Sequence, residues 1–475
     1  MFKRNPGLCY LPNLQRELNR GELYMRNRSL LTAAVAMALS GNPALAAPFG
    51  SFDPRSMAMG DTGVASGTGA NASFYNPALL AKKNGQFHLE FPVIGFNVAD
   101  PDELIKDLDD FQSGTELDTL DAAVTNFNLS PTSTNAQAVV DSMSDVNDIV
   151  KTFSNRALEG SLFGGSVVSF PTQNWGMAVH ISGMAAGGAQ LDYRDAQTVD
   201  TLNGELTQLI ALQDAIQNAT TDAEKIAALQ DLQDFAENSQ FVQYDPVTET
   251  ATITNVDPES ELQTRAIAIA EVGISFARNV EFRFGELAIG VTPKYMQVST
   301  IDYVANVRSA DFSLDTNQVD TSSFNIDVGV AKQYTNGVTT GLVIKNLIPQ
   351  SFKTANTTGM GDIELKPLAR LGVAHSAAWN SIVSSTVALD LDITENEPVG
   401  FDQKTRYLGV GAELDLYRTA QLRVGYKKNL SDGSYADSVS AGFGLSPFGI
   451  HMDVALSASP NLEQVAGGLQ LGFRY

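Results

Sequence analysis

Charged side chains alternate with apolar ones in several short segments, an arrangement that could line a polar interior. Asp390 and Asp392, for example, alternate with Leu389 and Leu391. A period of two is typical of β-strands, in which successive side chains point to opposite faces. The eight candidates for an inward-facing lining are Lys294, Asp327, Arg370, Asp390, Asp392, Glu413, Arg423 and Asp453. Their mixed signs favour an ion-paired network, and an ion-selective lining is the alternative.

No catalytic motif accompanies these charges. The sequence has no G-x-S-x-G, H-E-x-x-H or P-loop motif, and Gly60–Gly69 lacks the spacing of a nucleotide-binding loop. The four histidines are isolated from one another, each within an expected strand: His88, His180, His375 and His451. The sequence therefore predicts no catalytic residue, no metal site, no cofactor and no enzyme.

Alternating runs recur through most of the chain, separated by turn residues. The expected strands are 86–98, 160–171, 175–195, 264–278, 286–303, 321–334, 338–347, 368–378, 382–393, 404–416, 421–428, 437–445, 449–458 and 464–475. Short turns alternate with long loops, which is typical of an outer-membrane β-barrel with an even number of strands. Ile267 and Ile269 change phase relative to Val272 and Ile274, which predicts a bulge. We therefore expect an all-β fold, a 14-stranded antiparallel transmembrane barrel over residues 86–475.

The last strand carries a second signal. Its outward face would end on Phe473 and Tyr475. Because a barrel in lipid must close, this strand would form the seam. The terminal aromatic residues resemble the signal read by the barrel-assembly machinery, so we expect that machinery and outer-membrane lipid as partners.

Acidic residues concentrate in two segments. Residues 100–158 hold 12 Asp and Glu against 3 Lys and Arg, and residues 196–263 hold 13 against 1, so together they carry −21 of the net −23. Apolar residues at helical spacing predict helices in both, and Thr221 with Glu224 forms a capping-box pattern. We expect two acidic helical insertions packing on the protein itself, with a coiled-coil oligomer as the alternative. The negative charge argues against nucleic acid as a partner.

The beginning of the chain has the pattern of an export signal. A basic start, an apolar run from Leu30 to Leu39 and Ala44-Leu45-Ala46 fit a signal peptide over residues 25–46, cleaved near Ala46/Ala47. We expect Met25 to be the true start, with residues 1–24 an upstream segment. That segment contains the only cysteine, Cys9, so neither disulfides nor a cysteine metal cluster is expected.

Residues 47–85 begin with a compact, small-residue segment. It contains Arg55-Ser-Met-Ala-Met-Gly-Asp-Thr-Gly-Val-Ala65 and then Phe74-Tyr-Asn-Pro-Ala78. This pairing resembles the start of FadL-type outer-membrane barrels, and the longer chain with its acidic insertions resembles exported conjugal transfer proteins named TraF. The resemblance implies an N-terminal hatch inside the barrel, with Asn76, Pro77 and Ala78 in it. It also implies passage of a hydrophobic small molecule or a role in conjugation.

Three functions from different classes follow. The first is an outer-membrane barrel that passes hydrophobic compounds around its hatch. The second is a structural or assembly component of a conjugation or secretion apparatus, with other apparatus proteins as partners and no transport of its own. The third, an outer-membrane hydrolase, is disfavoured by the missing catalytic motif. Thioredoxin-like chemistry, associated with other proteins named TraF, is excluded because the chain has no C-x-x-C.

Overall fold

The computed structural model describes residues 53–475 except 82–86, 172–174, 248–249, 254–258, 284, 307–316, 398, 402–403 and 432–436. The expected signal peptide, its cleavage site and the segment 1–24 lie outside the described residues. Among the described helices, none is both long and apolar enough to cross a membrane.

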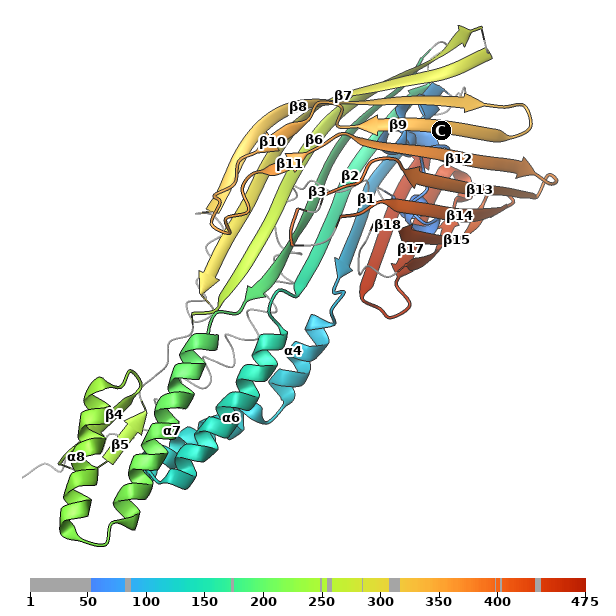
Figure 1. Cartoon of the computed structure of the whole chain (residues 1–475). Helices are drawn as coiled ribbons and strands as arrows, with labels where there is room; N and C mark the ends of the chain where they lie inside the picture. The colour runs from blue at the N-terminus through green and yellow to red at the C-terminus, as the bar shows by residue number, and fades with distance from the viewer. Residues whose placement is uncertain are drawn as a thin grey trace, which may run out of the picture.

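Fourteen of the described strands close into one antiparallel barrel, as the sequence predicted (Figure 1). In ring order, β1 neighbours β18 on one side and β2 on the other, and the remaining strands follow between them. The barrel strands are β1 (His88–Ala99), β2 (Ala157–Pro171), β3 (Gly176–Asp192), β6 (Glu261–Phe282), β7 (Gly285–Asn306), β8 (Gln318–Gln333), β9 (Val338–Lys345), β12 (Leu368–Ala378), β13 (Val383–Asp392), β14 (Tyr407–Leu416), β15 (Ala420–Asn429), β16 (Ser438–Leu445), β17 (Ile450–Ala458) and β18 (Gln464–Arg474).

The wall of the barrel has two heights. Strands β9 and β12–β18 have 8 to 11 residues, about the length needed to span a bilayer when tilted. Strands β6 and β7 have 22 residues each. Val291 of β7 lies level with Ile344, near the end of β9, because both residues pair with Val328 of β8. From there β7 continues to Asn306, well beyond the ends of β9 and β12–β18, which we call the short wall. We call the shared part the spanning section and the excess the outer section.

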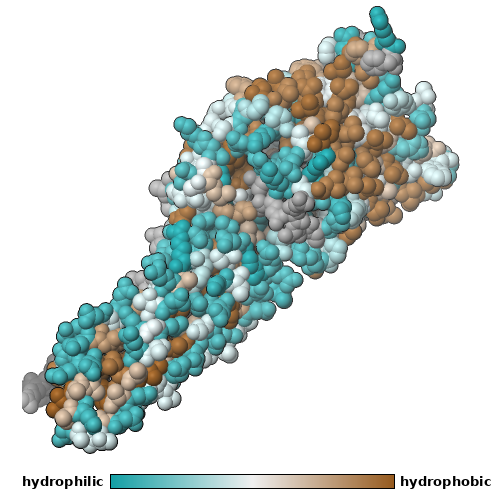
Figure 2. All heavy atoms as spheres, in the orientation of Figure 1, coloured by the Kyte–Doolittle hydropathy of each residue, from teal (hydrophilic) through white to brown (hydrophobic). Residues whose placement is uncertain are grey.

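In the spanning section, apolar side chains face outward and polar ones inward. Val387, Leu422 and Val439 are exposed on the outside, whereas Asp390 and Arg423 are buried on the inside. The outside of the barrel accordingly shows a broad hydrophobic surface (Figure 2). An apolar exterior with a polar interior is the pattern of a transmembrane barrel and the inverse of a soluble one.

In the outer section of β6 and β7, part of the inward face is apolar. Ile267, Ile269, Met296 and Val298 are buried on the inward face. The β6–β7 register is continuous from Glu261↔Asn306 to Phe282↔Gly285, so the bulge predicted from the phase change is wrong. The backbone continues unchanged, so we infer that the apolar inward residues mark the part of the strands that lies outside the lipid.

A register shift does occur in β1, between Glu90 and Val93, against both neighbouring strands. The connections alternate as expected. At one rim lie tight turns such as Tyr334–Val338, whose residue Gly337 has a positive φ of 83°. At the opposite rim lie the long loops and both helical insertions (Figure 1). One of these loops contains a small hairpin of β10 (Gln350–Phe352) and β11 (Ile363–Leu365).

The two acidic insertions form one helical arm rather than two separate bodies. Phe127 and Val139 from the first insertion share a buried cluster with Leu202, Leu206 and Leu232 from the second. The predicted capping box of Thr221 and Glu224 is present. The arm consists of α4 (Leu104–Ser113), α5 (Glu116–Leu129), α6 (Ser133–Thr152), α7 (Ala196–Asn218), α8 (Asp222–Asn238), β4 (Val242–Asp245) and β5 (Thr250–Ile253).

Candidate functional site

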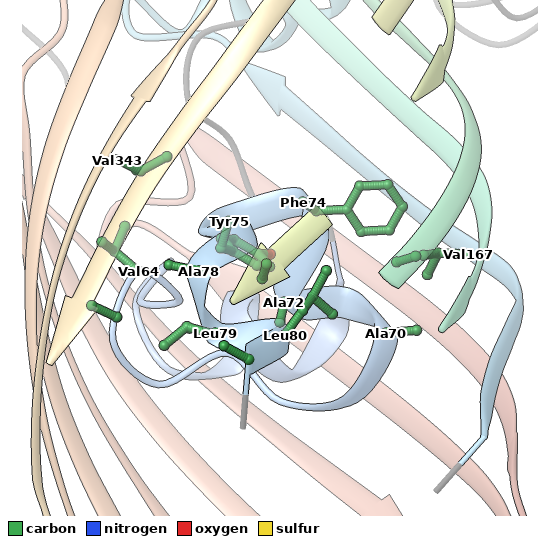
Figure 3. Packing of buried hydrophobic residues seen from close by; sticks show 14 of the residues in the cluster. Val64, Ala70, Ala72, Phe74, Tyr75, Ala78, Leu79, Leu80, Val167 and Val343 are labelled. Atoms are coloured by element: carbon green, nitrogen blue, oxygen red, sulfur yellow. The ribbon is translucent and has the colours of Figure 1, made fainter. Parts of the chain in front are cut away.

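The N-terminal segment Asp53–Ala81 lies inside the barrel, and we call it the lumenal segment (Figures 1 and 3). It contains α2 (Pro54–Ala58), η1 (Gly69–Asn71), α3 (Ala72–Tyr75) and η2 (Pro77–Ala81). Glycines on the inner wall allow a very close approach of the two backbones. A Cβ at Gly290 would come within 2.2 Å of the Ala78 nitrogen, and one at Gly409 within 2.1 Å of the Gly60 oxygen. These wall positions therefore require glycine.

The first half of the lumenal segment is held by charges of the short wall. The Arg55 guanidinium donates to both carboxylate oxygens of Glu413, at 2.8 and 2.9 Å. Glu413 also accepts from Arg423 at 2.7 Å, and Arg423 in turn pairs with Asp453 at 2.5 Å. Burial by itself would lower the pKa of Arg55, but the Glu413 carboxylate more than offsets this and raises it above its usual value. Arg55 therefore remains charged inside the barrel.

A second group of charges binds the next turn of the segment. Asp390 accepts from the backbone N–H groups of Gly63 and Val64 at 2.8 and 2.9 Å. Lys427 pairs with Asp61 at 2.9 Å, and Arg370 pairs with Asp392 at 2.5 Å. Arg370 also donates to the Asp61 carbonyl oxygen. Backbone groups of the segment are thus satisfied by side chains of the wall.

The second half of the segment packs mainly through apolar contacts with the longer strands β2, β3, β6, β7 and β8, which we call the tall wall (Figure 3). Phe74 stacks edge-on to Phe163 of β2, with ring centroids 5.6 Å apart. Asn76, fully buried, donates to the carbonyl oxygens of Val64 and of Val330 on β8. Its own side-chain oxygen accepts from the Ala78 N–H at 3.1 Å. Asn76, Pro77 and Ala78 therefore lie where the segment meets the tall wall; their role in a hatch stays a prediction.

One ionic cluster also reaches this half. Lys294 pairs with Glu271 and Asp327, each at 3.2 Å, and Lys345 donates to the Phe74 carbonyl at 3.0 Å. Seven of the eight charged candidates from the sequence are thus buried inside the barrel and Glu413 is partly buried, in ion pairs or, for Asp390, in hydrogen bonds to backbone. The ion-paired interpretation fits this geometry better than an open selective lining.

Several ionic partners in the interior are not among the residues predicted from the sequence. Arg55 and Asp61 both lie in the N-terminal motif, and both form ion pairs with the wall. One feature of the sequence points to such a partner. The eight wall candidates comprise three bases and five acids, so pairing all the acids requires a cation from outside this set. Glu90 and His451 form a further buried pair at 2.5 Å, joined by Gln470. Among the described residues, no group of three or more His, Cys, Asp or Glu is placed to hold a metal ion.

The C-terminal aromatics lie at the seam. The Phe473 side chain points outward on β18, which pairs with β1, and Tyr475 exchanges both backbone hydrogen bonds with Phe87. The seam is closed to the last residue. Whether Phe473 and Tyr475 are also an assembly signal remains a prediction.

Together, the closed ring, apolar exterior and internal segment define a transmembrane β-barrel whose lumen is occupied by its own N-terminal region. The family model described as "F plasmid transfer operon, TraF, protein" matches residues 73–392, and the chain belongs to that family. No curated protein matches the sequence significantly.

Among solved structures, three barrels resemble this chain over most of its length. The toluene transporter TbuX of Ralstonia pickettii is 14% identical, with 89% of this chain and 97% of that one covered and a TM-score of 0.41. The toluene transporter TodX of Pseudomonas putida is 11% identical, with 91% of this chain and 99% of that one covered and a TM-score of 0.44. A FadL homologue of Pseudomonas aeruginosa is 10% identical, with 91% of this chain and 99% of that one covered and a TM-score of 0.47.

Proposed function

We propose that this protein is an outer-membrane barrel that admits hydrophobic compounds from outside the cell into the outer section of its interior. The lumenal segment acts as the hatch that keeps water and ions from passing. The mature protein begins near Ala47, after cleavage of the signal peptide. The helical arm and long loops stand outside the cell, because they follow odd-numbered strands that run outward from the periplasm.

The observation that carries this proposal is the apolar inner face of the outer section. Ile267, Ile269, Met296 and Val298 point inward and together form an apolar surface on β6 and β7. A polar pore has no need of such a surface, whereas a site for an uncharged, apolar compound does. The lumenal segment lies in the barrel interior below this apolar face, and its ion pairs with the wall support its role as a hatch.

The test is uptake of N-phenyl-1-naphthylamine, an uncharged aromatic probe, by cells that lack other outer-membrane transporters for hydrophobic compounds. We expect faster uptake with the protein than without it. The matched control is a variant with Ile269→Asp and Val298→Asp, which keeps the barrel strands but makes the inner face polar. Equal uptake by wild type, this variant and the empty host would refute the proposal.

A second function is favoured by the arm. Its net negative charge and its own buried core make it a stable acidic projection, suited to a basic protein of a conjugation apparatus. Membership of the plasmid-transfer family supports this alternative. The arm is tied to the barrel by the Arg156–Asp107 pair at 2.9 Å and by Asp195, which accepts from Ser260 N–H at 3.2 Å. Removing residues 100–155 and 196–258 should abolish DNA transfer from donor cells if this function applies, and leave probe uptake intact.

A further inference from the structure

The apolar inner face of the outer section is not empty: the β10–β11 hairpin covers it. Phe352, Ile363 and Leu365 of the hairpin share one buried cluster with the four inward residues of β6 and β7. Phe352 is 2% exposed and Val298 1%. The chain thus places three of its own hydrophobic side chains where a hydrophobic ligand would lie.

Polar contacts pin the loop that carries this hairpin to the same wall. Asp302, fully buried on β7, accepts from the Thr357 hydroxyl at 3.0 Å and from the Thr358 N–H and hydroxyl at 2.8 and 3.1 Å. Arg265, directly opposite Asp302 in the register, donates to the Gly361 carbonyl at 2.8 Å. The Thr300 hydroxyl donates to the Lys353 carbonyl at 2.7 Å.

The hairpin is not part of the barrel wall. Strand β9 pairs directly with β12, so the ring is closed without β10 and β11, which pair only with each other. Moving the hairpin therefore breaks no hydrogen bond between barrel strands, although it breaks the contacts above and the one from the Gln350 side chain to the Phe324 carbonyl of β8. It exposes apolar surface, at a cost that another apolar molecule of similar size can offset by covering the same residues.

We propose that the β10–β11 hairpin is a built-in competitor that occupies a hydrophobic ligand site formed by Ile267, Ile269, Met296 and Val298. The ligand class is an uncharged, apolar molecule, because the four residues that would line the site all have apolar side chains. The Asp302 contacts act as the latch, so ligand binds only when the loop is released. This inference rests on the proposed transport function and adds its regulation.

A reversible crosslink tests the latch. In a chain with Cys9→Ser, the pair Asp302→Cys and Thr357→Cys replaces two side chains in hydrogen-bond contact and should form a disulfide that holds the loop down. The matched control is Ser376→Cys with Thr386→Cys, whose hydroxyls lie 3.0 Å apart across β12 and β13, away from the hairpin. Non-reducing gels measure crosslinking, and N-phenyl-1-naphthylamine measures uptake.

We expect the oxidised latch variant to take up the probe more slowly than wild type by about tenfold or more. Reduction should restore uptake to above the wild-type rate, since the Asp302 contacts are then absent. The control pair should be unaffected by oxidation. Equal uptake in the oxidised and reduced latch variant, with wild type still active, would overturn the competitor role while leaving transport intact. Uptake no faster than the empty host in all variants would overturn transport itself, and this inference with it.

Discussion

The spanning and outer sections of β6 and β7 belong to the same two strands, yet the apolar side chains of their inward faces differ. In the spanning section, Ile289 and Val291 point outward and Thr292 points inward. In the outer section, Ile269 and Val298 point inward, while Gln297 points outward. The backbone register does not change between them.

The comparison shows that the surroundings, not the strand, decide which face is apolar. In lipid the outside must be apolar and the inside can be polar if its charges are paired. In water the outside is polar, and the apolar face must find cover within the protein. The change of phase in a continuous strand therefore marks where the wall leaves the membrane.

The largest effect should come from opening the seam within the spanning section. Deleting Phe473–Tyr475 removes the last β18 pairs with β1, and unpaired backbone in lipid costs several kcal/mol per group. We expect no heat-modifiable outer-membrane species on gels. The comparison variant, Phe473→Ala with Tyr475→Ala, keeps the backbone pairs and separates the seam from an aromatic assembly signal. A deletion that still assembled would contradict the account.

The second-largest loss of stability should come from breaking an ion pair inside the spanning section. Glu413→Ala leaves Arg55 and Arg423 without their shared partner, which should cost about 3–5 kcal/mol. The outer counterpart is Glu397→Ala, which breaks an exposed pair with Lys366 and should have no measurable effect. Urea unfolding in lipid vesicles measures both. Equal losses would mean that the two environments do not differ.

A charge on the outside of each section sharpens the contrast further. Val291→Arg places a cation on the lipid-facing surface, which should cost about 2–4 kcal/mol if it lies near the membrane centre. Gln297→Arg, on the same face six residues along β7, should be neutral because the side chain is already exposed to water. The same unfolding measurement applies, and similar values for the two would argue against a boundary between them.

The fourteen strands could be predicted from the sequence because apolar and polar side chains alternate wherever one face of a strand contacts lipid and the other does not. The sequence also predicted the capping box of Thr221 and Glu224, which is a local pattern. The bulge predicted near Ile267 and Ile269 was wrong. A shift in the positions of the apolar residues has the same pattern in the sequence whether it comes from a bulge or from a change in the surroundings of the strand. The ionic partner of Glu413 could not be found, since Arg55 is 358 positions away in sequence. For the same reason, sequence did not show that the two insertions form one arm.

The smallest predicted effect lies in the arm, which stands apart from both sections. Thr221→Ala removes the N-cap of α8 and should cost the arm about 1 kcal/mol, with no change in the barrel. Amide hydrogen exchange should be faster in α8 and unchanged in β14. Thr220→Ala is the control, because its neighbouring hydroxyl contacts Glu224 without capping the helix. Faster exchange in the barrel strands would show that the arm is not an independent unit.

The most direct test of the membrane boundary is lipid quenching along the outward face of β7. In a chain with Cys9→Ser, single cysteines at 289, 291, 297 and 299 are labelled with a fluorophore, and the protein is placed in vesicles of brominated lipid. We predict strong quenching at 289 and 291 and little at 297 and 299. Equal quenching at all four positions would contradict the account, because the strands would then remain in lipid through the change of phase.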